Sequence, residues 1–165
     1  TKFALAVILI DILKGFIPAK YISQLIFISS TQIISIEASA VICGLGAVLG
    51  HVYPIYYGFR GGKGAGTAIG MVVAIYPSTL FIGLGIFILN LTLTGWVGLG
   101  TILASISIFI YSLISLPSIN IFFVYGTFVL ALFIIFTHRS NILRMIQGNE
   151  NQFEKAMIFK KKINK

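Results

Sequence analysis

The sequence predicts an all-α fold, a polytopic transmembrane helical bundle with six helices visible in this chain. Hydrophobic side chains make up 58% of the 165 residues, charged ones only 10%, and the mean hydropathy is +1.01. A water-soluble domain carries about 25% charged residues, so most of this surface must face lipid. Apolar runs such as 128–135 do not alternate with polar residues. The strands of a membrane barrel would alternate, so helices are expected.

Six apolar segments can be delimited, and we expect each of them to be a helix. They cover about 3–28, 36–57, 65–76, 78–93, 98–116 (up to Pro117) and 120–137. The third is shorter than the ~20 residues of a full span. We expect it to stop before Pro77 and to cross obliquely or only part-way. Gly62, Gly66 and Gly70 recur every fourth residue and predict a small-residue face against which another helix packs.

The distribution of charge predicts the orientation of the spans. The formal net charge is +8, and basic residues gather in the loop with Arg60 and Lys63 and in the tail 139–165. Four predicted crossings separate these two regions, so both should lie on one side of the membrane, together with the loop 95–98. Cations favour the cytoplasmic side, which places these loops in the cytoplasm. No basic stripe with interleaved aromatic residues occurs, so nucleic acid is not an expected partner.

The loop 58–64 is the most informative polar segment. Gly61, Gly62 and Gly64 surround Lys63 just before the third segment. Glycines permit positive φ and close approach of a ligand, so backbone N–H groups and the lysine could form a phosphate-binding nest. The spacing is not that of a Walker A loop. From this loop alone, a tight interhelical turn with two topogenic cations is an equal alternative.

Two further groups of polar residues lie in or beside apolar segments. Asp11 and Lys14 are three residues apart on one helical face, which indicates either a buried ion pair or contact with a site. His138 and Asn141 share a face just after the sixth segment, near the cations Arg139 and Arg144. A helix end that binds lipid headgroups is the alternative there. A lone histidine near a helix end, such as His51, is more often a hydrogen-bonded structural group.

Three motifs in this order resemble the bacterial acyl-phosphate-dependent glycerol-3-phosphate acyltransferases. The family's Asp-x-x-Lys-Gly is present at 11–15. Its Gly-His-x-aromatic-Pro and Phe-basic-Gly-Gly-Lys-Gly follow at 50–54 and 59–64, ending at Thr67. Its His-Arg-x-Asn-Ile-x-Arg motif begins at 138 and continues to Glu150. Together they cover nearly the whole chain.

The chain departs from the family pattern in two places. Where members often have Tyr-x-Ser-Leu, this chain has Trp96-Val97-Gly98-Leu99. Members also have an additional N-terminal span followed by a motif with active-site residues. We therefore expect residues 1–165 to form a single membrane-embedded acyltransferase domain that lacks this span and motif, with seven spans in the full-length protein.

The resemblance implies transfer of an acyl group from acyl phosphate to the 1-hydroxyl of glycerol 3-phosphate. The product would be lysophosphatidic acid, in the first step of phospholipid synthesis. Acyl phosphate is a mixed anhydride with a good leaving group, so positioning and charge stabilisation suffice and neither a cofactor nor a metal is expected. The implied roles are catalytic for His138, Asn141 and Lys63, phosphate-binding for Arg60, Gly61, Gly62, Gly64, Thr67 and Arg144, and supporting for Asp11, Lys14, His51 and Glu150.

The same resemblance implies a location and partners. We expect a multi-pass protein of the bacterial plasma membrane, with its active site facing the cytoplasm. Acyl phosphate, glycerol 3-phosphate and membrane lipid are the expected partners, with functional coupling to the enzyme that makes acyl phosphate. The alternatives are a catalytically silent homologue and a lipid-binding or transport protein. A transporter would predict two related halves with broken helices, which the sequence lacks. Gly98 leaves the silent homologue open.

Overall fold

The computed structural model of the chain describes residues 2–29, 34–115 and 119–158, and the regular elements in these ranges are helical. The predicted all-α bundle is therefore confirmed. The α-helices are α1 (Lys2–Ile17), α2 (Ser23–Ser29), α3 (Ile36–Val52), α4 (Ala65–Ile75), α5 (Pro77–Thr94), α6 (Val97–Ile114), α7 (Ile121–Thr137) and α8 (Arg139–Ile146).

The predicted segments correspond to these helices with few differences. The first segment continues from α1 through a π-helical turn, Pro18–Ile22, directly into α2. A wider turn accommodates the proline, which has no N–H and disturbs an α-helical hydrogen bond. As predicted, the third segment ends before Pro77, which begins α5. The predicted end of the fifth segment, with Pro117, lies outside the described residues.

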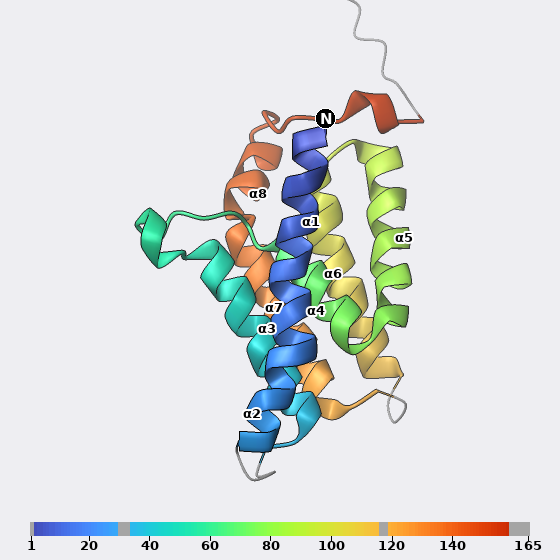
Figure 1. Cartoon of the computed structure of the whole chain (residues 1–165). Helices are drawn as coiled ribbons and strands as arrows, with labels where there is room; N and C mark the ends of the chain where they lie inside the picture. The colour runs from blue at the N-terminus through green and yellow to red at the C-terminus, as the bar shows by residue number, and fades with distance from the viewer. Residues whose placement is uncertain (1, 30–33, 116–118, 159–165) are drawn as a thin grey trace, which may run out of the picture.

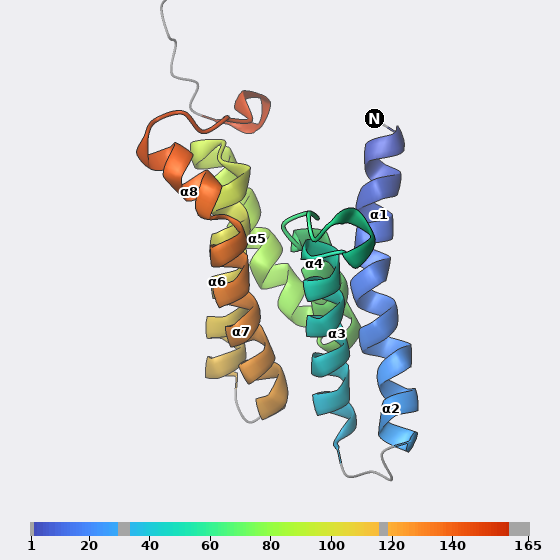
Figure 2. The same ribbon diagram turned by 90° about the vertical axis from the view of Figure 1, so that its left-hand side faces the viewer.

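Among the described residues, three helical stretches are long and apolar enough to cross a membrane, namely Ile36–Tyr57, α5 and α6. A fourth is obtained if α7 and α8, which meet at a bend of 53°, are counted as one span. The helices run side by side between two ends of the molecule (Figures 1 and 2). The start of α1, the α5–α6 turn and α8 lie toward the same end (Figure 1), and the common side predicted for the loop 95–98 and the tail agrees with this arrangement.

The short helix α4 packs very closely on α1. A Cβ atom added at Gly70 would lie 1.9 Å from the carbonyl oxygen of Ile12, and one at Gly15 would lie 1.9 Å from that of Thr67. Gly66 also faces α1. The backbones can approach this far only because these positions lack side chains. The predicted small-residue face is thus confirmed for Gly66 and Gly70.

The third glycine of that predicted face, Gly62, has a different position. It precedes α4 and lies in the loop, so helical spacing does not apply to it. A Cβ there would lie 2.3 Å from Nε2 of His51 on α3. Gly62 therefore allows the loop to pack closely against α3, and it is not part of the contact between α1 and α4.

The inner core lies where α3, α4 and α7 meet. Val48, Met71, Phe123 and Ile134 are almost fully buried there. Large apolar side chains on the outer faces are exposed, for example Phe81 at 73%. Such an arrangement is stable when the surrounding solvent is lipid, because exposure of these groups then costs little.

Candidate functional site

A chain of polar side chains joins the glycine-rich loop to α8 and the segment after it. Lys63 Nζ donates a hydrogen bond to Oδ1 of Asn141. The other end of this amide, Nδ2, donates to Glu150 Oε1 at 2.6 Å. Arg144 Nε donates to Oε2 of the same carboxylate, also at 2.6 Å. The structure thus brings together four predicted site residues that are up to 87 positions apart in the sequence (63 to 150).

The directions of these hydrogen bonds depend on one another. An ionised carboxylate can only accept, so Glu150 fixes the amide of Asn141 with its nitrogen toward the carboxylate. The amide oxygen then faces Lys63, which can only donate. Both ends of the amide are engaged in this arrangement. Asn141 therefore orients Lys63 here, and its predicted direct role toward substrate stays a prediction.

The charges in this network alter the ionisation of its members. Burial by itself would raise the pKa of Glu150, whose side chain is 6% exposed, but the hydrogen bonds from Asn141 and Arg144 and the nearby positive charges lower it below its ordinary value. Burial, and then the charge of Arg144, lower the pKa of Lys63, whereas the carboxylate of Glu150 acts in the opposite direction. Because its pKa is lowered, Glu150 stays ionised near neutral pH and keeps its ion pair with Arg144.

The junction between α7 and α8 places His138 beside this network. α7 ends at Thr137, whose hydroxyl donates to the Lys63 carbonyl oxygen at 3.0 Å and so attaches the loop to α7. His138 is 4% exposed, and its Nδ1 lies 2.8 Å from the carbonyl oxygen of Ile134. A carbonyl only accepts, so Nδ1 carries the proton. In the neutral ring, Nε2 then has the free lone pair.

A second cluster lies between α1 and α3. Asp11 Oδ1 is 3.0 Å from Lys14 Nζ, so the predicted ion pair is present, and 3.5 Å from Nδ1 of His51. The imidazole of His51 in turn contacts the backbone at Gly62. A Cβ at Gly66 would lie 3.0 Å from Cβ of Asp11. Both clusters therefore contact the glycine-rich loop or the start of α4 directly after it.

The glycines of the loop have two different roles. Gly64 has a φ of +84°, a left-handed conformation that favours glycine just before α4. Gly61 is needed for close approach, since a Cβ there would lie 2.0 Å from the His51 carbonyl oxygen. The N–H of Gly61 donates to the Val52 carbonyl oxygen at 3.0 Å, so it is already engaged. Phe59, with a φ of +62°, carries strain that the sequence did not reveal.

Two predicted phosphate-binding residues lie apart from the polar network. Arg60 is exposed on the loop. Thr67 is fully buried, and within the described part of the chain its hydroxyl has no hydrogen-bond partner. Their predicted roles stay predictions.

Two residues that contact the network were not predicted as site residues. One is Thr137, and the other is Gly98 at the start of α6. A Cβ at Gly98 would lie 2.8 Å from Nδ2 of Asn141, so the missing side chain makes room for the amide. The α5–α6 turn is further covered by the C-terminal segment, where Phe153 N–H donates to the Gly95 carbonyl oxygen at 2.8 Å. The departure from the family pattern at Gly98 therefore lies directly beside the site.

The fold and the site define an integral membrane protein with a partly buried, cationic polar site toward one end of a helical bundle. A family model described as glycerol-3-phosphate acyltransferase matches residues 1–148. The glycerol-3-phosphate acyltransferase of Aquifex aeolicus (strain VF5) is 38% identical over 156 residues, covering 92% of this chain and 74% of that protein. The one from Chlorobium phaeobacteroides (strain BS1) is 36% identical over 180 residues, covering 92% and 75%. The chain belongs to the glycerol-3-phosphate acyltransferase family.

Solved structures support the same conclusion. The chain is similar to crystal structures of PlsY (YgiH), an integral membrane glycerol 3-phosphate acyltransferase, in its lysophosphatidic acid and glycerol 3-phosphate forms. Each has a TM-score of 0.79 and 36% sequence identity, and the match covers 92% of this chain and 73% or 72% of the other. The predicted family and the predicted class of enzyme, an acyltransferase, are confirmed. The roles of individual residues remain predictions.

Proposed function

We propose that this chain transfers an acyl group from acyl phosphate to the 1-hydroxyl of glycerol 3-phosphate. The observation that carries the proposal is the convergence of Lys63, Asn141, Arg144 and Glu150 in one partly buried network, with His138 next to it at the α7–α8 junction. Both proposed substrates carry a phosphate, and the network offers cations whose hydrogen-bonding capacity is only partly used. The PlsY structures that resemble this chain were determined in forms named for glycerol 3-phosphate and for the acylated product.

Lys63 is the central phosphate ligand in this proposal. Its ammonium group has three N–H donors, and the bond to Asn141 uses one. The remaining two can bind phosphate oxygens. Arg144 uses its Nε toward Glu150, which leaves the terminal nitrogens of a side chain that is 42% exposed. Since the single negative charge of Glu150 offsets part of the charge of Lys63 and Arg144, the site can hold two positive groups close together and keeps a net positive charge for an anionic substrate.

The reaction needs neither a nucleophilic side chain nor a cofactor in this proposal. The 1-hydroxyl oxygen of glycerol 3-phosphate forms a bond to the acyl carbon, and the bond from this carbon to the phosphate oxygen breaks. The phosphate leaves with that electron pair. The hydroxyl proton goes to the free Nε2 lone pair of His138 or to the departing phosphate. Lys63 and Arg144 stabilise the negative charge that develops on the leaving phosphate.

We further propose that the site faces the cytoplasm of a bacterial cell and receives acyl phosphate from the enzyme that makes it. The loop with Arg60 and Lys63 and the described part of the basic tail, residues 139–158, lie toward one end of the bundle, and positive loops favour the cytoplasmic side (Figure 2). Labelling with a membrane-impermeant amine reagent should therefore modify Lys155 only after the cell membrane is opened. Modification in intact cells would contradict this orientation.

The test is an assay of the purified protein with hexadecanoyl phosphate and radiolabelled glycerol 3-phosphate. We expect lysophosphatidic acid to form in proportion to the inorganic phosphate released. Hexadecanoyl thioesters of coenzyme A serve as the matched control donor. Binding of both substrates without product would identify a silent homologue, and uptake of label into vesicles without acylation would identify a transporter.

A further inference from the structure

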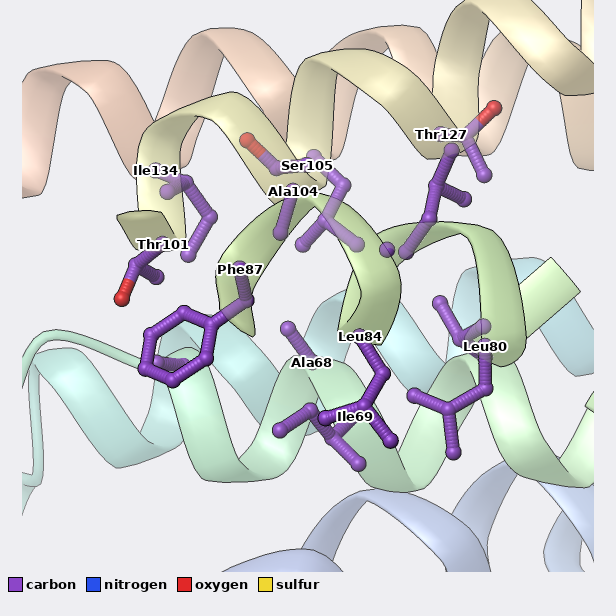
Figure 3. A pocket seen from close by; sticks show the side chains of 15 residues that line it. Ala68, Ile69, Leu80, Leu84, Phe87, Thr101, Ala104, Ser105, Thr127 and Ile134 are labelled. Carbon is purple, nitrogen blue, oxygen red and sulfur yellow. The ribbon is translucent and has the colours of Figure 1, made fainter. Parts of the chain in front are cut away.

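Two cavities of the bundle differ in the chemistry of their walls. The larger, of about 190 Å³, lies between α4, α5, α6 and α7, and apolar side chains such as Ile69 and Leu84 line it (Figure 3). The second cavity, of about 130 Å³, lies where the π-helical turn Pro18–Ile22, α2, α3 and the end of α4 meet. Its wall combines small apolar side chains with the polar side chains of Lys20, Gln24 and Glu37. The second cavity can therefore bind a polar group.

The second cavity lies far from the polar network described above. Glu37 is in the first turn of α3 and His51 in the last, and the 14 positions between them (37 to 51) correspond to about 21 Å along the helix. Ile75, which ends α4, also lines the cavity. The hydroxyl of the next residue, Tyr76, accepts a hydrogen bond from the N–H of Asn120, the N-cap of α7. The cavity thus lies where α3 and α7 begin, toward the end of the bundle with α2 (Figure 1).

The π-helical turn brings two pairs of residues to this cavity. In an α-helix, a residue and the fourth residue after it differ by about 40° in direction around the axis. A wider turn reduces this difference, so Ala19 and Ser23, each 1% exposed, both face the neighbouring helices. Lys20 and Gln24, one position after each, also line the cavity. The Ser23 hydroxyl donates to the Ala19 carbonyl oxygen at 2.7 Å, which leaves Lys20 and Gln24 as the polar groups available to a ligand.

Lys20 and Glu37 carry opposite charges across the second cavity and are not paired. Within the described part of the chain, neither side chain has an ion-pair or hydrogen-bond partner. Glu37 is not needed to cap α3, because the Ser35 hydroxyl accepts from the N–H of Ala38. Charged side chains beside lipid normally have a partner or face water. This arrangement leaves one positive and one negative group available on the same cavity.

A zwitterionic group matches this arrangement better than an ion with a single charge. An anion would leave Glu37 unpaired, and a cation would leave Lys20 unpaired. In a phosphoethanolamine group, the phosphate accepts from Lys20 and the ammonium donates to Glu37. Quaternary ammonium groups such as choline are recognised by aromatic rings, and among the described residues that line the cavity none is aromatic. The wall therefore favours a primary ammonium.

We propose that the second cavity binds the phosphoethanolamine headgroup of a phospholipid. Lys20 and Gln24 hold the phosphate, and Glu37 holds the ammonium. A volume of 130 Å³ equals that of about four water molecules, so the cavity admits a headgroup but not the acyl chains. These chains lie on the apolar surface beside it, where Ile36 and Leu25 are 40% and 67% exposed. With the orientation proposed above, the lipid belongs to the outer leaflet, and it joins the π-helical turn to α3.

The first test is a titration of the purified protein in detergent with dioctanoyl phosphatidylethanolamine, followed by native mass spectrometry. We expect Lys20→Gln and Glu37→Gln each to raise the Kd about five-fold, because each removes one charge-assisted hydrogen bond at a partly exposed site. Lys155→Gln and Glu154→Gln are the matched controls. They cause the same changes in net charge at exposed positions near the other end of the bundle and should leave the Kd unchanged (Figure 1). A Kd that neither Lys20→Gln nor Glu37→Gln alters would show that both charges are merely solvated, and would refute the proposal.

Two further ligands test which parts of the lipid are bound. Dioctanoyl phosphatidylglycerol has no ammonium group, so Glu37→Gln should not weaken its binding; equal weakening of both lipids would show that the carboxylate does not contact the headgroup. Glycerophosphoethanolamine has the same headgroup without acyl chains and should bind much more weakly. Equal binding at the same concentration would overturn the assignment to a lipid.

A second measurement does not depend on the variants. The unmodified protein is reconstituted in bilayers of equal parts phosphatidylethanolamine and phosphatidylcholine, extracted with detergent and washed, and the retained lipid is identified. We expect phosphatidylethanolamine to be enriched, because the choline headgroup cannot donate hydrogen bonds to Glu37. Equal retention of the two lipids would refute the proposal even if the substituted proteins are too unstable to purify.

Discussion

Replacement of Glu150 by glutamine tests the direction of the hydrogen bonds in the polar network. Glu150 accepts one bond from Asn141 and one from Arg144, each at 2.6 Å. A glutamine has nearly the same size, but only one of its two terminal atoms accepts. Its NH₂ group must therefore face either the Asn141 amide nitrogen or Arg144, both of which are donors. If the Asn141 amide turns to relieve this conflict, its nitrogen faces Lys63.

The size of the effect follows from the one charged hydrogen bond that is lost. A bond to a charged group contributes roughly 1.5–3 kcal/mol when desolvated. Glu150 is nearly buried, but Arg144 is 42% exposed, so solvent screening reduces this to about 1–2 kcal/mol. We therefore expect kcat/KM to fall by about five- to thirty-fold in Glu150→Gln.

The substitution should also change the pH dependence. The carboxylate of Glu150 raises the pKa of Lys63 against the lowering effects of burial and Arg144, so its removal lowers this pKa further. Lys63 then loses its proton at a lower pH, and the alkaline limb of the kcat/KM profile moves toward neutral pH.

At the acid end, the lowered pKa of Glu150 contributes stability that is fully present above the ordinary carboxyl value of about 4.3. This stability is lost as the pH falls through the pKa that Glu150 has in the folded state. The free energy of unfolding of Glu150→Gln should not show this decrease, because glutamine does not titrate.

The assay measures release of inorganic phosphate at saturating acyl phosphate across the pH range, with Glu154→Gln as the control. Glu154 is an exposed carboxylate four residues further on, so its replacement alters the net charge equally without touching the network. If both variants show the same rate and the same alkaline limb, Glu150 does not orient Asn141 and Lys63, and the reasoning is wrong.

Three other substitutions test separate contacts. Lys63→Ala should lower kcat/KM by at least ten-fold through loss of a charged phosphate contact of roughly 1.5–3 kcal/mol, with normal membrane insertion; near-normal turnover would favour a purely topogenic role. Gly98→Ala should reduce turnover because its Cβ would lie within 3.0 Å of the Asn141 side chain, whereas Gly85→Ala, with nothing within 4 Å, should be silent; equal activities would show that Asn141 can move freely. Gly70→Ala should overpack the contact between α1 and α4 and so lower the free energy of unfolding by about 1–3 kcal/mol. The thermal unfolding midpoint measured in detergent should therefore fall, and an unchanged midpoint would contradict that packing.

The sequence was sufficient to predict the fold class because lipid offers no hydrogen-bond partners to the backbone. Each apolar segment must be helical to satisfy its backbone, so the six predicted segments were found as helices. The shortness of α4 followed from the position of Pro77. The π-helical turn at Pro18 was not predicted, because a proline within a helix can be accommodated in several ways that depend on neighbouring helices.

The site was predicted where its residues lie within a short motif, and less well where it depends on contacts between helices. Lys63, His138 and Asn141 were identified from local patterns and a family resemblance. Thr137 was not, because its hydroxyl becomes important only through the approach of the Lys63 carbonyl. The network with Glu150 likewise depends on how the segment after α8 folds back, which spacing alone does not determine. Gly98 was seen as a missing hydroxyl, whereas in the structure it is the space that the Asn141 amide occupies.

The 11-residue helix α4 connects the polar network to the apolar interior of the bundle. A helix of this length extends about 16 Å, roughly half of the hydrocarbon core, so at least one of its ends lies at membrane depth. Its N-terminus receives the loop with Lys63, and on its side Ala68 and Val72 line the apolar cavity between α4, α5, α6 and α7. A full-length span would place the Lys63 loop at the membrane surface, far from any hydrocarbon wall. The close packing of Gly70 on α1 holds α4 in place, so a single short element fixes the loop with Lys63 relative to the apolar interior of the bundle.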